Sequence, residues 1–164
     1  MDNSLHWFAV YTKPRNEKKL TLLLQNKGID VFLPLRKTLK EWSDRKKMVE
    51  EPLISSYVFV NVDQRDYYEV LNTDGAVKYI WFSGKPAIIP ASQIDVLKKI
   101  ISSGAEVECV AGNFQTGSIV EINRGPLTGL KGELIAIAGK KKLLIRIQNL
   151  EKNLVVSVSP GMVM

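Results

Sequence analysis

The stretch from residue 57 to residue 62 has the hydrophobic pattern of a buried β-strand. It is rich in β-branched and aromatic side chains, which favour sheets: Tyr57, Val58, Phe59 and Val60. Alternate side chains of a strand share a face, so Tyr57 and Phe59 point one way and the two valines the other. Two interpretations follow. Either both faces are covered by other layers, or the aromatic face binds an apolar partner.

The segments before this strand predict another strand and a helix. Residues 7–12 form an apolar run too short for a helix, which indicates a central strand. From residue 13 to residue 27 the period changes to an i, i+3, i+4 stripe of Leu20, Leu23 and Leu24. The pattern predicts a helix that Asn16 caps and Gly28 ends.

Residues 29–39 return to strand character, with Pro34 marking an edge or a bulge. The polar residues 40–47 predict the exposed tip of a hairpin that leads back toward residue 57. We expect this tip to be short, with a modest reach. Trp42 lies in the tip beside basic residues, where it could stack on a nucleic-acid base or pack on its own hairpin.

The following segments complete a predicted α+β domain. They are a short helix at 64–71, a turn at 72–75, a strand at 77–82, an extended piece at 87–89, and a helix from Ser92 whose Asp95 completes a capping box. This order predicts an antiparallel sheet with helices on one face, an α+β sandwich of the ferredoxin-like kind. The opposite face of such a sheet is free to bind.

The hydrophobic pattern of the last part of the chain differs from that of the segments before it. Residues 105–116 show no clear period, and we predict a linker at 112–116. Short alternating segments follow at 118–123, 131–138, 143–148 and 154–158. Several short strands separated by turns predict a small all-β barrel. The predicted domains are therefore residues 1–111 and 117–164.

The composition is that of a soluble globular protein, with 45% hydrophobic and 24% charged residues. No apolar run approaches the roughly 20 residues that span a bilayer, and no signal peptide is visible. The single Cys109 excludes an internal disulfide and a cysteine-based metal site. We expect a cytoplasmic protein without a membrane partner.

Basic residues gather in two blocks. Residues 13–47 hold eleven Lys/Arg and four Asp/Glu, residues 48–115 have a balance of −4, and residues 116–164 one of +4. This distribution suits a nucleic acid that touches both basic blocks, although a solvated surface of mixed charge is the alternative.

Four cations crowd the predicted helix start near residue 16, namely Lys13, Arg15, Lys18 and Lys19. Cations at a helix N-terminus are electrostatically unfavourable. A bound polyanion would reverse that cost, so the cluster predicts a phosphate contact. Arg45, Lys46 and Lys47 in the hairpin tip are further candidates for nucleic-acid binding.

The sequence contains no recognisable catalytic constellation. His6 is the only histidine, and Cys109 has no second histidine to pair with. Spacings typical of phosphate loops, metal sites and nucleophile elbows are missing from the sequence. We therefore expect a binding protein without catalytic residues, metal or cofactor.

Several motifs resemble a known family. The segments WFAVYTKPRNEKKL, EEPLISSYVFVNV and KPAIIP look like the N-terminal (NGN) domain of NusG-type transcription factors, and VEINRGPLTGLKGEL looks like their KOW motif. The segments FLPLRK, EWSDRKK and YVFVNV resemble those of the specialised UpxY-like antiterminators of Bacteroidetes. The domain organisation is similar to that of the RfaH paralogue.

The resemblance implies an NGN sandwich followed by an SH3-like KOW barrel. It implies a monomeric, non-enzymatic elongation or antitermination factor that binds the clamp helices of RNA polymerase and the non-template DNA strand and suppresses pausing or termination. We expect it to serve particular operons, and a general housekeeping factor is the alternative within the family. The barrel would bind a ribosomal protein or a termination factor.

The resemblance also implies roles for individual residues. The apolar clamp-binding patch would comprise Tyr57, Phe59, Ile54 and Phe82, and the segment meeting the opposite polymerase lobe Arg65, Asp66, Tyr67 and Tyr68. Lys13, Arg15 and Lys19 would face the non-template strand. The KOW signature would be Gly125, Pro126, Leu127, Gly129 and Gly132.

Two positions depart from the family pattern. Ser55-Ser56 stands where a proline and a small residue usually precede the YVFV-like strand, which puts the rigidity of that loop in doubt. Leu127 replaces a phenylalanine in the KOW motif as an acceptable apolar substitute.

One relative of this family folds its C-terminal segment as a helical hairpin. Here Ile135, Ile137, Ile145 and Ile147 alternate with the period of strands, and Pro126 alone would cost a helix about 3 kcal/mol. We expect a barrel. A KOW-type RNA-binding or ribosome-associated protein is the alternative function, and it would leave Tyr57 and Phe59 buried.

Overall fold

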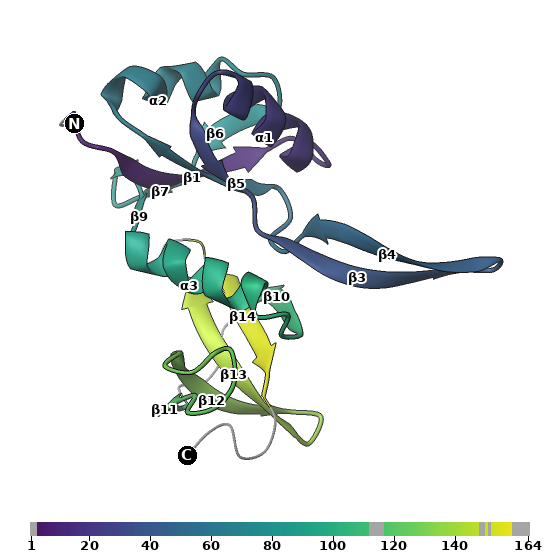
Figure 1. The fold of residues 1–164 in the computed structure, drawn as a ribbon. Coiled ribbons are helices and arrows are strands. Elements are labelled where there is room, and N and C mark those ends of the chain that lie inside the picture. Colours follow the sequence, from purple (N-terminus) through teal and green to yellow (C-terminus); the bar gives the residue numbers. More distant parts are fainter. Residues whose placement is uncertain (1–2, 112–116, 148–149, 151, 159–164) are drawn as a thin grey trace. The chain divides into compact units, whose positions relative to one another are not determined.

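The computed structural model describes residues 3–111, 117–147, 150 and 152–158 (Figure 1). The chain forms two compact units, Met1–Ala91 and Ser92–Met164. Each unit is built around its own antiparallel sheet.

The first unit alternates strands and helices as the sequence predicts. Its elements are β1 (His6–Thr12), α1 (Glu17–Asn26), β2 (Asp30–Phe32), β3 (Leu35–Trp42), β4 (Arg45–Pro52), β5 (Tyr57–Val62), α2 (Gln64–Leu71), β6 (Ala76–Tyr79), β7 (Trp81–Phe82), β8 (Lys85–Pro86) and β9 (Ile88–Ile89). The main sheet has the order β2-β5-β1-β6, and β9 also pairs with β1. The two strands predicted at 7–12 and 57–62 are its central pair.

The core of the first unit lies between this sheet and its two helices. The inward valines of β5, Val58 and Val60, pack with Phe8 and Val10 of β1. The helices contribute their apolar stripes to the same cluster: Leu20, Leu24, Tyr67 and Val70. Burying each such side chain stabilises the fold by about 1.5–3 kcal/mol. Both helices therefore cover the valine face of the sheet (Figure 1), and the predicted one-sided α+β sandwich is confirmed.

Strands β3 and β4 form a separate two-stranded hairpin that projects from the main sheet of the first unit (Figure 1). Pro34 divides the strand predicted at 29–39 into β2 and β3, and its carbonyl accepts a hydrogen bond of 2.9 Å from the Leu53 N–H. Each strand of the hairpin has 8 residues, which corresponds to roughly 27 Å of length. The prediction of a short tip with modest reach is thus wrong, because the charged residues 36–41 and 45–50 pair into a regular ladder.

The second unit contains a helix and a five-stranded sheet. Its elements are α3 (Ala91–Ser102), β10 (Val107–Ala111), β11 (Ser118–Glu121), β12 (Lys131–Ile137), β13 (Lys140–Ile147) and β14 (Lys152–Ser157), in the sheet order β10-β14-β13-β12-β11. The predicted strands are confirmed. Strand β10 lies before the predicted domain boundary at residue 111, yet it pairs with β14 across Cys109 and Leu154. The sequence showed no period there, and the predicted linker at 112–116 lies outside the described residues.

The glycines of the predicted KOW motif are explained by two different constraints. Gly125 and Gly129 adopt positive φ angles of 84° and 93° in the turn after β11, a conformation that favours glycine. At Gly132 the constraint is space, because an added Cβ would lie 2.8 Å from Leu143 Cγ and 2.9 Å from the Leu144 carbonyl oxygen. Leu127 is buried in this turn, as an apolar substitute for phenylalanine should be.

Candidate functional site

The loop between β1 and α1 is held by neighbours that are distant in the sequence. The Thr12 N–H donates to the Ser56 carbonyl at 2.8 Å, and the Lys13 N–H donates to the Gly75 carbonyl at 2.9 Å. Arg15 has a positive φ of 62°, so the chain turns sharply before α1 begins. The cations of this loop are therefore displayed from a backbone tied to two other segments.

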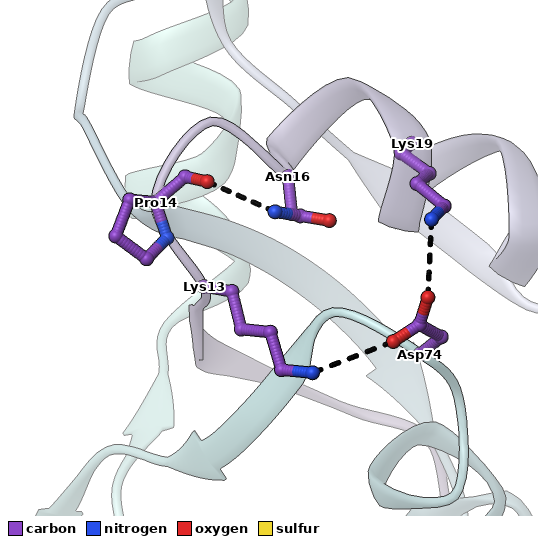
Figure 2. Close-up of polar contacts among 5 residues, drawn as sticks. All are labelled: Lys13, Pro14, Asn16, Lys19 and Asp74. Atoms are coloured by element: carbon purple, nitrogen blue, oxygen red, sulfur yellow. Dashed lines mark hydrogen bonds and ion pairs between the residues drawn. The ribbon is translucent and has the colours of Figure 1, made fainter.

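Two of these cations share one carboxylate (Figure 2). Lys13 Nζ lies 3.5 Å from Asp74 Oδ1, and Lys19 Nζ lies 3.1 Å from Asp74 Oδ2. The hydrogen bond from Lys19, followed by its charge and by Lys13, lowers the pKa of Asp74. Sequence reasoning missed Asp74 because it lies in the turn after α2, and its acidic side chain was the only local signal. All three side chains remain about 60% exposed, so an anion can still reach the lysines.

The side chain of Lys18 contacts a different segment from the side chains of Lys13 and Lys19. Its Nζ donates to the Glu50 carbonyl oxygen at 2.6 Å, which ties α1 to the base of the β3–β4 hairpin. The structure therefore brings Lys13 and Lys19 together at Asp74 and separates Lys18 from them.

The start of α1 is stabilised differently from the prediction. Asn16 occupies the N-cap position, but its side-chain amide donates to the Pro14 carbonyl at 2.9 Å and does not cap the helix. The buried Glu17 supplies the favourable charge in the first turn, and its Oε2 accepts a hydrogen bond of 3.0 Å from the Ser56 N–H. The Ser55-Ser56 loop is thus anchored to α1 despite its departure from the family pattern.

The predicted clamp-binding residues differ in how exposed their side chains are. Phe59 is 0% exposed and stacks on Phe32 of β2 with ring centroids 6.1 Å apart, and Ile54 is buried as well. The expectation that Phe59 lies on the surface is wrong, since β2 pairs with β5 and brings Phe32 directly opposite Phe59. Tyr57 is half-buried against the ring edge of Tyr11, whereas Phe82 is 58% exposed.

The residues predicted to meet the opposite polymerase lobe lie at the start of α2. Asp63 caps this helix by accepting the N–H groups of Arg65 and Asp66 at 3.0 and 3.1 Å. These backbone bonds, that of Asp66 first, and the Arg65 guanidinium at 3.1 Å lower the pKa of Asp63. Arg65 is exposed and Asp66 is half-buried.

The two adjacent tyrosines of α2 point in opposite directions. Tyr67 is buried in the core, where it stacks on Tyr79 at 4.1 Å and its carbonyl accepts the Tyr79 hydroxyl at 2.7 Å. Burial raises the pKa of both tyrosines. Tyr68 is exposed. Of this pair, only Tyr68 offers a ring to a partner.

One exposed aromatic residue was not predicted as a site. Trp81 stands beside Phe82 in the small β7–β8 hairpin, and 58% of each residue is exposed. The signal in the sequence was a second large aromatic residue, Trp81, directly beside the predicted site residue Phe82 and just before the turn at Ser83-Gly84.

At the tip of the β3–β4 hairpin, the three predicted cations have different surroundings. Lys46 Nζ lies 3.3 Å from Glu41 Oε1, so its charge is partly balanced. The Arg45 guanidinium lies 5.4 Å from the centroid of the Trp42 ring. Trp42 therefore packs on its own hairpin and still remains 47% exposed.

The part of the chain that the structure describes shows no groups of three or more His, Cys, Asp or Glu residues that could hold a metal ion. None of its helices is both long and apolar enough to cross a membrane. What the geometry offers is a set of exposed aromatic and basic side chains on the first unit.

Comparisons with known proteins identify a family and a similar fold. Residues 5–98 match the family model described as transcription termination factor nusG. The chain is similar to the solved structure described as domain interaction in Thermotoga maritima NusG, with 19% identity, 98% of this chain and 96% of that chain covered, and a TM-score of 0.60. This likeness concerns the fold.

More distant matches are the two MjSpt4:Spt5 complex structures. Conformation A has 19% identity, 96% of each chain covered and a TM-score of 0.31; conformation B has 18% identity, 96% of this chain and 95% of that chain covered, and a TM-score of 0.34. A comparison with curated protein sequences finds no match.

Proposed function

This chain belongs to the NusG family, since the family model covers more than half of its residues, and on that premise we propose that it acts on RNA polymerase as a transcription elongation and antitermination factor. It does so by binding, without catalysis. The observation that carries this proposal is that the matched residues 5–98 contain both the exposed aromatic groups and the basic loop before α1.

In this proposal the first unit bridges the polymerase cleft. Tyr57 and Phe82 are the accessible members of the clamp-binding set, and the buried Phe59 and Ile54 support the sheet from which Tyr57 projects. Arg65 and Tyr68 face the opposite lobe from the exposed side of α2, with Asp66 beside them, while Tyr67 holds that helix to the core.

The non-template DNA strand lies against the loop before α1. Lys13, Arg15 and Lys19 contact its phosphates, and Asp74 competes with the phosphates for the two lysines. The bound factor suppresses pausing or termination on particular operons. The KOW barrel recruits a ribosomal protein or a termination factor.

A KOW-type RNA-binding or ribosome-associated role is the second candidate. The burial of Phe59 favours it, because that role needs no exposed aromatic face on the first unit. The family match favours polymerase binding, because it covers the first unit and ends at residue 98, before the strands of the barrel.

Capture of bacterial RNA polymerase by the full chain tests the proposal. We expect Tyr57→Ala and Phe82→Ala each to weaken polymerase binding about 30-fold, since a central interface aromatic commonly contributes 2 kcal/mol or more. Leu22→Ala, which removes an exposed apolar side chain of α1, is the matched control. Equal capture of all four proteins would refute the proposed clamp surface, and tight binding of free RNA without polymerase capture would support the second candidate.

A further inference from the structure

The β3–β4 hairpin presents two faces of different chemistry. The register pairs Trp42 with Arg45, Lys40 with Lys47, Thr38 with Val49 and Arg36 with Glu51, and these eight residues share one face, here called the basic face. The opposite face carries the alternate pairs: Glu41 with Lys46, Leu39 with Met48, Lys37 with Glu50 and Leu35 with Pro52.

The charges of the two faces differ. The basic face carries four cations and one carboxylate, whereas the opposite face carries two of each. The lone carboxylate, Glu51, lies at the base of the hairpin, where Arg36 and Lys40 approach it at 3.2 and 3.4 Å. Hydrogen bonds, first from Thr38, lower the pKa of Glu51. Excess positive charge therefore accumulates toward the tip, at Arg45 and Lys47.

The basic face also carries the only aromatic ring of the hairpin. Trp42 is 47% exposed, and the Arg45 guanidinium lies 5.4 Å from its ring centroid. This contact places the guanidinium over the indole, and about half of the residue stays exposed to a partner. An exposed ring beside cations is the combination that binds unpaired bases, because the base stacks on the ring and the cations attract the backbone.

We propose that the basic face of the hairpin binds a single-stranded nucleic acid, with Trp42 stacking on one unpaired base and Arg45 and Lys47 contacting the flanking phosphates. The proposal deepens the nucleic-acid part of the proposed function and rests on it. A duplex fits less well, since its bases are already stacked and offer no free ring face. Arg45 and Lys47 lie two residues apart on β4, roughly 7 Å, so they contact different phosphates.

The test is a titration of the full chain, without polymerase, against labelled oligo(dT), oligo(U) and a duplex of equal length at low salt. We expect Trp42→Ala to weaken single-strand binding about tenfold, and Trp42→Phe to retain most of it because phenylalanine also stacks. Lys47→Ala should reduce the salt slope by about 0.7, the value for one phosphate contact on a single strand.

The opposite face supplies matched controls on neighbouring residues. Lys46→Ala removes the same charge as Lys47→Ala but from an ion pair with Glu41 on the opposite face, so it should weaken binding less than Lys47→Ala does. Met48→Ala removes an exposed apolar side chain and should bind like the unaltered chain. A preference for oligo(U) would identify RNA as the ligand and a preference for oligo(dT) would identify DNA, and either supports the proposal.

Four results would overturn it: no binding by the unaltered chain, unchanged binding by Trp42→Ala, equal effects of Lys46→Ala and Lys47→Ala, or tighter binding of the duplex. Polymerase capture by Trp42→Ala is measured in parallel. Intact polymerase capture with weakened oligonucleotide binding is the expected result for Trp42→Ala. Failure of the unaltered chain to capture polymerase would count against the proposed function and not against this site.

Discussion

Neighbouring residues of the same strand face serve different purposes in this protein. Tyr57 and Phe59 share the face of the sheet opposite α1 and α2, but Phe59 is fully buried against Phe32 while Tyr57 remains partly accessible beside Tyr11. The partner strand decides the difference, since β2 pairs with β5 at Phe59 but ends before Tyr57. Phe59 is thus a residue of the fold, and Tyr57 is available to a partner.

This difference predicts opposite outcomes for two alanine variants. Phe59→Ala should lower the free energy of unfolding by about 3–5 kcal/mol, because it leaves a cavity where a buried ring was. Tyr57→Ala should change stability much less and act mainly on polymerase binding. Urea denaturation of both variants measures this. A Phe59→Ala protein as stable as the unaltered chain would contradict the assignment.

At the scale of elements, the loop before α1 is a junction of three segments. The Thr12 N–H donates to the loop before β5, and the Lys13 N–H donates to the turn after α2. Asp74 in that turn pairs with Lys13 and Lys19, and Glu17 at the start of α1 accepts the Ser56 N–H. Asp74 partly neutralises the lysines that a nucleic acid would contact, and the same contacts, that of Lys19 first, lower the pKa of Asp74. The loop is therefore a basic surface on which the Asp74 carboxylate competes with a bound phosphate for Lys13 and Lys19.

We expect Asp74→Asn to strengthen nucleic-acid binding by up to about fivefold at low salt, because it releases Lys13 and Lys19 from an exposed ion pair. Glu69→Gln is the control, since it removes the same charge from the pair with Lys27, which lies outside the predicted site. Salt-dependent titration of both variants against a single strand measures the effect. Equal tightening by both would indicate a general charge effect only.

At the scale of the whole molecule, the chain is divided into two units with separate sheets. The first unit carries the exposed aromatic and basic groups of the predicted site, and the second unit carries the turn after β11 with the KOW glycines. In the second unit, Glu133 accepts a hydrogen bond from Arg146 across β12 and β13 at 2.5 Å and another from the Gly117 N–H at 3.1 Å. The close approach at Gly132 adds to these constraints. Glu133 and Arg146 are 13 residues apart in the sequence, and the antiparallel pairing of β12 with β13 brings them together.

We therefore expect strand-type carbon chemical shifts across residues 131–147 in the full-length chain in solution. Glu133→Gln should weaken the cross-strand pair and lower the melting temperature of the second unit without making those shifts helical. Backbone assignment by NMR is the measurement. Helical shifts in the full chain that become strand shifts in the isolated second unit would show a change of fold instead.

Much of the fold could be predicted because it depends on local patterns. The alternation in β1 and β5, the leucine stripe of α1 and the helix at 64–71 each occupy consecutive residues, and burial of their apolar faces against one another leads directly to the α+β sandwich. The strands β11 to β14 were predictable for the same reason, whereas the glycines and Leu127 of the turn after β11 were predicted from the resemblance to the KOW motif.

What the tertiary structure alone decided depends on residues far apart in the sequence. Pairing of β2 with β5 buried Phe59, and the turn after α2 brought Asp74 to Lys13 and Lys19. The ladder of β3 with β4 brought Glu51 to Arg36 and Lys40. The strand character of β10 came from β14, more than 40 residues later. A local pattern states which way a side chain points along its own element, whereas its exposure and charge partners are set by whichever distant segment packs there.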